Sequence, residues 1–114
     1  MSLSQRKCVP CEGEAKPLSK AKAAQLQKKV PGWTLNGNAK MISRELVMKN
    51  FTSAVKLIGK VADIANAEDH HPDVHLTSYR NLKIELSTHA IKGLSENDFI
   101  VAAKINELPM ELKK

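Results

Sequence analysis

The sequence predicts an α+β domain in which a four-stranded antiparallel sheet carries three helices packed on one face, in the order α-β-β-α-β-β-α. Two observations lead to this fold class. Apolar residues alternate over residues 41–48, take a helical spacing from residue 51, and alternate again over residues 82–88. Short turn signals join the extended segments in pairs, which is typical of two hairpins. Each hairpin then has one apolar face that helices must cover.

The chain divides into an irregular basic leader over residues 1–17 and a single domain over residues 18–114. Most of the formal charge of +6 lies in residues 1–30, where seven Lys and Arg accompany two Glu. These basic residues have no aromatic residues among them, so we expect a solvated surface and no nucleic-acid interface. No segment has the length of a membrane span or the core of a secretory signal. We therefore expect a cytoplasmic protein without membrane contact.

The leader contains a Cys-x-x-Cys pair, Cys8 and Cys11. The redox form of this motif begins a helix after a strand, whereas here Pro10 lies between the cysteines. A structural zinc ion needs four ligands, and the chain has two thiols. We interpret the pair as reduced cysteines in a flexible arm, with redox or metal use as the alternative.

The first helix is expected directly after the leader. Ser19 is its N-cap, and Leu18 with Ala23 has the form of a hydrophobic staple. Pro31-Gly32 ends the helix.

A β-hairpin follows this helix. Residues 33–35 are extended, Asn36-Gly37-Asn38 forms the turn, and residues 41–48 are the second arm. Arg44 is an exception among the apolar residues of this arm, which are Ile42, Leu46 and Met48.

The longest helix is predicted from residue 51, after Asn50 as N-cap. Its end is expected near residue 68 or 69, because a polar run begins at Asn66 and Pro72 follows. Its apolar stripe consists of Phe51, Ala54, Val55, Ile58, Val61, Ala62 and Ala65.

The second hairpin is predicted over residues 74–79 and 82–88, with Arg80-Asn81 as its turn. His89 stands at the end of the second strand, where a side chain can emerge at the rim of the sheet. The last helix begins after Ser95, with Asp98 as the acidic residue of a capping box, and buries Phe99 among others.

The histidines are the main functional signal of the sequence. Three of the four fall within residues 66–75, and His89 follows. The helix ending near residue 69 directs the negative end of its dipole at His70 and His71, beside the Asp69 carboxylate. An imidazole that is readily protonated can serve as a general acid.

Topology is expected to bring the histidines together, because the hairpin that starts at Pro72 returns His89 to the helix end. Zinc binding is the alternative, favoured by the spacing of His71 and His75. That spacing places two imidazoles on one face only in a helix, which Pro72 disfavours. For His75 a purely structural role is an equal alternative.

The run His70-His71-Pro72 is followed by Tyr79 after six intervening residues, by His89 after nine more and by Asp98 after eight more. This pattern resembles the pterin-4a-carbinolamine dehydratase family. The resemblance covers roughly residues 18–110. One departure is Asn66, because the family commonly carries an acidic residue four positions before the first histidine.

The resemblance implies dehydration of 4a-hydroxytetrahydrobiopterin to quinonoid dihydrobiopterin and water, in tetrahydrobiopterin recycling. This reaction needs a proton delivered to the leaving oxygen at C4a and a proton removed from N5. Two imidazoles of opposite protonation state meet both needs without a metal or a cofactor. We assign His71 and His89 to acid/base catalysis, and His70 to holding the pterin ring and sharing in proton transfer, with these roles open to exchange.

Four further residues are candidates for substrate binding. Asp69 lies beside the histidines, and Pro72 is expected to shape the pocket wall. Asp98 either bonds the substrate or a histidine, or serves the helix start as its acidic residue. Trp33 either lies along the pterin or packs in the core.

Self-association is expected from an exposed strand edge and an incompletely covered helix layer. The resemblance points to a homodimer or homotetramer. The family also contains dimerisation partners of transcription factors and relatives linked to carboxysome assembly, in which the catalytic histidines are eroded. The alternative function is therefore protein binding with little catalysis, and the intact histidine set favours the enzyme.

Overall fold

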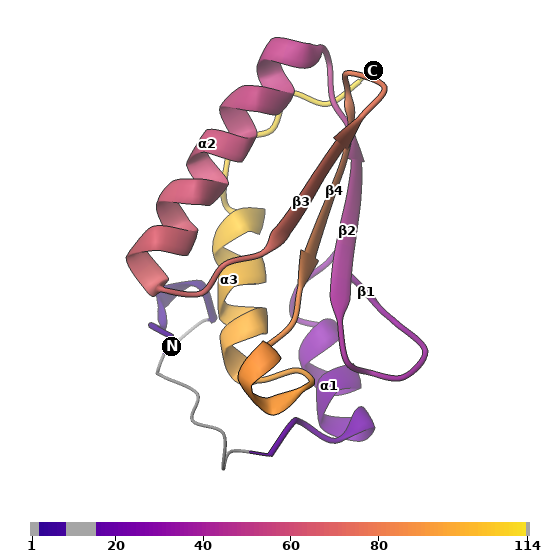
Figure 1. Cartoon of the computed structure of the whole chain (residues 1–114), viewed down its shortest axis with the longest axis vertical. Coiled ribbons are helices and arrows are strands. Elements are labelled where there is room, and N and C mark those ends of the chain that lie inside the picture. Colours follow the sequence, from indigo (N-terminus) through magenta and orange to yellow (C-terminus); the bar gives the residue numbers. More distant parts are fainter. Residues whose placement is uncertain (1–2, 9–15, 114) are drawn as a thin grey trace.

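The computed structural model describes residues 3–8 and 16–113 and has the predicted α+β fold and element order (Figure 1). No helix of this described part is both long and apolar enough to cross a membrane. The elements are the 3-10 turn η1 (Leu3–Gln5), α1 (Lys20–Gln27), β1 (Thr34–Leu35), β2 (Ile42–Val47), α2 (Phe51–Glu68), β3 (Asp73–Thr77), β4 (Asn81–Leu86), the 3-10 turn η2 (His89–Ile91) and α3 (Glu96–Asn106).

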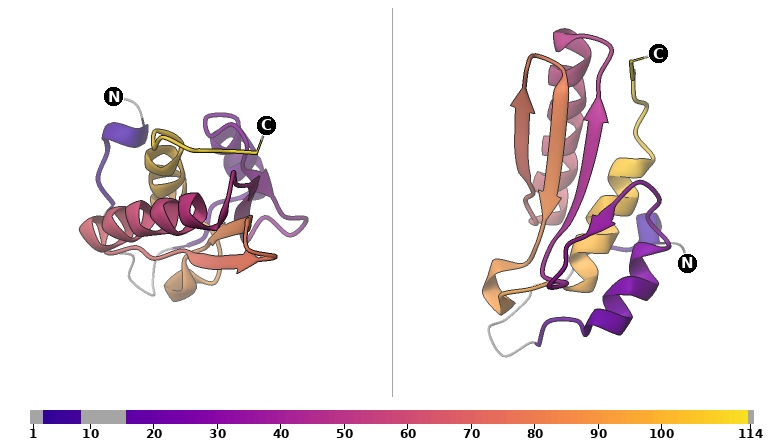
Figure 2. Two further views of the ribbon diagram at one scale, coloured as in Figure 1. Left: turned by 90° about the horizontal axis from the view of Figure 1, so that it is seen from above. Right: turned by 90° about the vertical axis from the view of Figure 1, so that its right-hand side faces the viewer.

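The four strands form one antiparallel sheet in the order β1-β2-β4-β3, so the two hairpins join through β2 and β4. The register pairs Ile42 with Leu86 and Leu46 with Leu82. Since side chains alternate along a strand, the apolar residues of both central strands share one face. The helices lie on that side of the sheet, and the other face is left open (Figure 2). The core between the layers includes Ala23, Leu26, Ile42, Leu46, Leu57, Val61, Leu82, Ile84, Phe99 and Ile105.

Helix α2 begins and ends where the sequence predicts, but its buried face is rotated. The Asn50 side chain accepts from the Ser53 backbone N–H at 2.8 Å, and the Ser53 hydroxyl accepts from the Asn50 N–H, which completes a capping box. Phe51 and Val55, predicted on the apolar stripe, are 54% and 47% exposed. Ala54, Val61 and Ala65 of the predicted stripe are buried, and Leu57, which lies beside that stripe, is buried with them.

The turn of the second hairpin lies earlier than predicted. Asn81 pairs with Thr77 and is the first residue of β4, so only Arg80 of the predicted Arg80-Asn81 pair lies in the turn. Ser78, Tyr79 and Arg80 form the turn, and φ is 48° at Ser78 and 56° at Tyr79. Ser78 and Tyr79 are not among the residue types that usually adopt left-handed backbone, which are Gly, Asn and Asp. The sequence therefore has no turn signal at these two positions. Tyr79 therefore lies between β3 and β4, whereas His71 and His89 flank the opposite end of this hairpin.

Trp33 and Arg44 meet at one side chain of α3. Trp33 is 2% exposed, and its Nε1 donates to Oδ1 of Asn106 at 2.8 Å. The Arg44 guanidinium donates to the same oxygen. This contact explains why a cation lies on the apolar side of β2, and partial burial lowers the pKa of Arg44. Trp33 is thus a core residue.

Residues 3–8 of the leader pack on the domain. Residues Leu3–Gln5 form η1, which contacts α3. The sequence predicts an irregular segment here, because three residues are too few to show an apolar period. Residues 9–15, which include Cys11, lie outside the described residues.

Candidate active site

A pocket of about 640 Å³ lies at the end of the molecule where α2 and β4 stop and α3 begins. It contains three of the four histidines, His70, His71 and His89, and is also bordered by the N-terminal segment. The described lining residues are Lys7, Cys8, Ala67, Glu68, Asp69, His70, His71, Ser87, Thr88, His89, Ala90 and Asn97.

The end of α2 positions His70 and His71. Asp69 adopts the left-handed conformation with φ of 52°, and its N–H bonds to the carbonyl of Ala65. The His70 N–H bonds to the same carbonyl at 3.1 Å. These two bonds stop the helix and turn the chain, so that both histidines follow the negative end of the helix dipole.

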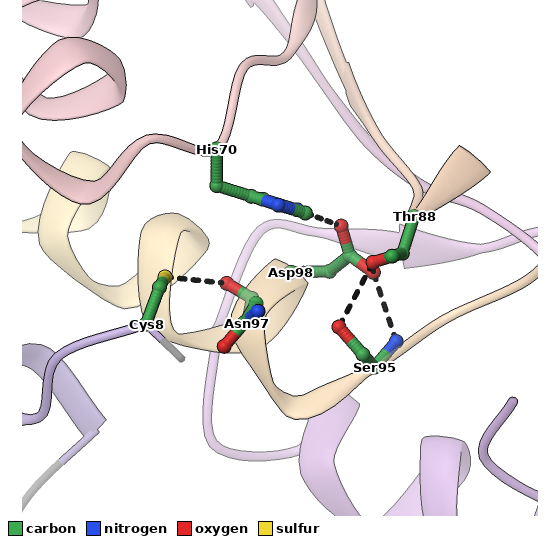
Figure 3. A network of polar contacts seen from close by, with 6 residues as sticks. All are labelled: Cys8, His70, Thr88, Ser95, Asn97 and Asp98. Carbon is green, nitrogen blue, oxygen red and sulfur yellow. Dashed lines mark hydrogen bonds and ion pairs between the residues drawn. The ribbon is translucent and has the colours of Figure 1, made fainter. Parts of the chain in front are cut away.

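His70 is fixed by a buried carboxylate (Figure 3). Its Nε2 lies 2.7 Å from Oδ1 of Asp98, whose side chain is 0% exposed. Oδ2 of Asp98 accepts from the Thr88 hydroxyl at 2.8 Å and from the Ser95 backbone N–H at 2.9 Å. A carboxylate only accepts, so Nε2 of His70 carries the hydrogen. Asp98 thus has both of the predicted roles, because it caps α3 and contacts a histidine. It is not among the described residues that line the pocket.

His71 has a different environment. Its Nε2 lies 3.0 Å from Oδ1 of Asn66, one turn back on α2, and both residues are exposed. Asn66 is the position at which the resemblance implies an acidic residue. An amide oxygen orients the ring but adds no full negative charge beside it.

His89 reaches the pocket from the other side. It is the first residue of η2, which follows β4 after two residues, and it is exposed. The antiparallel return of the hairpin therefore places His89 beside the pocket that His70 and His71 line, as topology predicted.

The fourth histidine does not join this group. His75 lies on the open face of the sheet, where its Nε2 is 2.5 Å from Oε1 of Glu85 on β4. No group of three or more His, Cys, Asp or Glu in residues 3–8 and 16–113 could hold a metal ion.

The candidates for substrate binding separate into two groups. Asp69 lines the pocket, whereas Pro72, Asp98 and Trp33 are not among its described lining residues. Pro72 follows directly on the histidine pair and is half-buried. Trp33 lies in the core beside Asn106.

Sequence reasoning missed the contribution of the N-terminal segment. Lys7 and Cys8 line the pocket although they precede His70 by more than 60 positions. The Cys8 N–H donates to Oε1 of Glu68 at 2.8 Å. Burial and the Glu68 carboxylate raise the pKa of the Cys8 thiol to about 12. The thiol is thus uncharged near neutrality and a poor nucleophile. In the sequence, the Cys-x-x-Cys pair is the one feature that draws attention to this segment.

Comparisons with known proteins agree with the motif. The pattern that defines the family described as Pterin 4 alpha carbinolamine dehydratase matches residues 16–108. A Halorhodospira halophila protein, provisionally named as this dehydratase, is 44% identical over 108 residues, which cover 95% of this chain and 98% of that protein.

A second relative is the mitochondrial pterin-4-alpha-carbinolamine dehydratase 2 of Arabidopsis thaliana, which is 49% identical over 112 residues. The match covers 96% of this chain but only 60% of the plant protein. Among solved structures, a transcriptional coactivator/pterin dehydratase from Brucella melitensis superposes with a TM-score of 0.74 at 26% identity, over 80% of this chain and 96% of that one. The chain therefore belongs to the pterin-4-alpha-carbinolamine dehydratase family.

Proposed function

We propose that the protein dehydrates 4a-hydroxytetrahydropterins, with 4a-hydroxytetrahydrobiopterin as the expected substrate and quinonoid dihydrobiopterin and water as products. The observation that carries the proposal is that His70, His71 and His89 line one pocket in a chain of this family. The volume of about 640 Å³ is in the range of small-molecule sites.

His71 and His89 are the proposed acid/base pair. One of them, as imidazolium, protonates the hydroxyl at C4a, and the C4a–O bond breaks as water leaves. The N5 lone pair forms the new double bond to C4a, and the other imidazole accepts the N5 proton. The two proton transfers balance, so the net charge of the pair is unchanged, and proton exchange with solvent restores the starting protonation state of each ring. Exposure of both rings favours that exchange.

His70 is the proposed holding residue. Its Nε2 is engaged by Asp98, so the ring is fixed and Nδ1 is the nitrogen left for the pterin. A histidine whose ring is oriented by a buried carboxylate can hold a ligand with little loss of side-chain entropy.

The test is turnover of chemically generated 4a-hydroxytetrahydropterin, followed by ultraviolet absorbance. We expect the parent to exceed the spontaneous rate, and His71→Ala and His89→Ala to lose most of that acceleration while their circular dichroism is unchanged. His75→Ala is the matched control, because His75 lies on the open face of the sheet away from the pocket. Equal activity of parent and both pocket variants contradicts the assignment.

A second proposed function is protein binding, both to other copies of the chain in a homodimer or homotetramer and to a protein partner. Two features of the surface support it. Phe51 and Val55 expose large apolar side chains one turn apart on α2, and β1 and β3 are the edges of the sheet. The Brucella melitensis protein is described as a coactivator as well as a dehydratase. Sedimentation of the parent and of Phe51→Ser tests self-association, and an affinity pull-down tests a stoichiometric protein partner. A monomeric parent contradicts the oligomer.

The proposed location is the cytoplasm. The Arabidopsis thaliana relative is named as mitochondrial, so cell fractionation with an antibody to this protein is the measurement that decides.

A further inference from the structure

We propose that the N-terminal arm, defined here as residues Leu3–Cys8, is a substrate-contacting wall of the histidine pocket, in which Lys7 binds the pterin and Glu68 positions the arm. This inference rests on the proposed dehydratase function and extends it to a segment outside residues 16–108, the part that the family pattern matches.

The arm is held by side chains at the end of α2 and on α3. The Cys8 N–H donates to Oε1 of Glu68 at 2.8 Å. The Cys8 thiol lies 3.6 Å from the carbonyl oxygen of Asn97 (Figure 3). Nζ of Lys104 donates to the Ser4 carbonyl at 2.8 Å and lies 4.0 Å from Oε2 of Glu68. One carboxylate thus joins the arm, α2 and α3.

These contacts differ in strength. The side chains of Glu68 and Lys104 are 10% and 19% exposed, so their hydrogen bonds are only weakly screened by solvent. The ion pair of Arg6 with Glu96 has a separation of 2.7 Å, but its side chains are 43% and 44% exposed. Exposed pairs contribute little. We therefore identify Glu68 as the residue on which the position of the arm chiefly depends.

The arm supplies a group that the remaining wall lacks. Among the described lining residues, Lys7 alone carries an ammonium group, and Glu68 and Asp69 carry the carboxylates. An ammonium only donates hydrogen bonds and a carboxylate only accepts them. The pterin head presents a carbonyl oxygen and ring nitrogens as acceptors, and an amino group as donor. Lys7 can donate to these acceptors. Asp69 can accept from the amino group, because the other carboxylate of the wall, Glu68, already accepts from the Cys8 N–H of the arm.

The first experiment separates binding from chemistry with Lys7→Glu, Lys7→Arg and the control Lys40→Glu, which reverses an exposed charge before β2, away from the pocket. For each, KM and kcat are measured, and the Kd for 7,8-dihydrobiopterin is determined by calorimetry. We expect Lys7→Glu to raise KM and Kd by about fivefold or more, with kcat within about twofold, as for loss of a uniform binding contact. Lys7→Arg and Lys40→Glu should stay near the parent.

The second experiment follows the arm itself by hydrogen exchange of peptides from residues 3–8. We expect bound 7,8-dihydrobiopterin to slow this exchange in the parent. Glu68→Ala should accelerate it by at least about tenfold and raise KM, whereas Glu68→Gln keeps an acceptor for the Cys8 N–H and should stay closer to the parent.

The outcomes distinguish the two proposals. If the parent turns over its substrate but Lys7→Glu leaves KM and Kd unchanged and the ligand does not slow exchange, the arm inference is wrong and the dehydratase function stands. If the parent neither binds the pterin nor turns it over, both proposals fail.

Discussion

Nε2 of His70 and Oδ1 of Asp98 lie 2.7 Å apart, although the residues are 28 positions apart in the sequence. Asp98 is in the first turn of α3, where its other oxygen accepts from the Ser95 N–H. The same side chain therefore begins a helix and orients a histidine of the pocket. Formation of α3 and orientation of the site are coupled through one buried carboxylate.

Asp98→Asn should impair both functions of this residue. An amide keeps the size of the side chain but has one acceptor oxygen where the carboxylate has two. With His70 no longer held by a charge-assisted bond, we expect kcat to fall by at least about tenfold. We also expect a loss of about 1–3 kcal/mol in the free energy of unfolding, measured in urea, because a buried polar contact is broken.

Ser95→Ala is the matched control for this substitution. It removes the hydroxyl that lies 2.8 Å from Oγ1 of Thr88 but leaves the backbone N–H that bonds to Asp98. We expect a loss of about 1 kcal/mol in stability, with kcat near the parent. Equal kcat values for Asp98→Asn and Ser95→Ala contradict a role of Asp98 in orienting His70.

Asn66→Asp should change the pH dependence of turnover. The new carboxylate lies where Oδ1 of Asn66 is now, 3.0 Å from Nε2 of His71, and favours the imidazolium form. The limb of the kcat/KM profile that belongs to His71 should therefore move to higher pH. Asn66→Ala, which removes the hydrogen bond without adding charge, should not produce that shift. A limb that moves to lower pH contradicts the assignment of His71.

The sequence was sufficient to predict the elements that depend on local chemistry. Short-range patterns predict the caps at Ser19 and Asn50, and they predict the end of α2 before Pro72. They also predict the alternation of Leu82, Ile84 and Leu86. The structure has all of these features. The meeting of three histidines also followed, because an antiparallel hairpin must return to its starting end.

Other features depend on contacts that no local pattern contains. The exposure of Phe51 and Val55 on α2 depends on how the helix packs against the rest of the core, to which it contributes Leu57 and Val61. The place of Trp33 depends on Asn106, which is 73 positions away. The arm at Lys7 and Cys8 depends on Glu68, 60 positions after Cys8. Such long-range pairs are visible only once the chain is folded.

The Cys8 thiol should make stability fall at alkaline pH. Its pKa is raised from 9.0 to about 12 by burial and by Glu68, so the folded state keeps a proton that the unfolded state releases above pH 9. When folding raises a pKa, the group's contribution to stability is complete at pH values below its pKa in the unfolded state. That contribution is lost as the pH rises through its pKa in the folded state. Between pH 8 and 10.5 the parent should therefore lose more stability in urea than Cys8→Ala does. Parallel losses contradict the shift, since all other groups titrate in both proteins.

Ser78→Gly should stabilise the protein. Ser78 is exposed and has φ of 48°, a conformation that costs a residue with a Cβ about 1 kcal/mol and costs glycine little. Glycine also increases the entropy of the unfolded chain, so we expect a net gain of about 0.5 kcal/mol and a rise in Tm of a few degrees. Thr77→Gly is the control, because Thr77 is an exposed strand residue paired with Asn81, where glycine should be destabilising. If both substitutions lower the Tm equally, the left-handed backbone at Ser78 is not a source of strain.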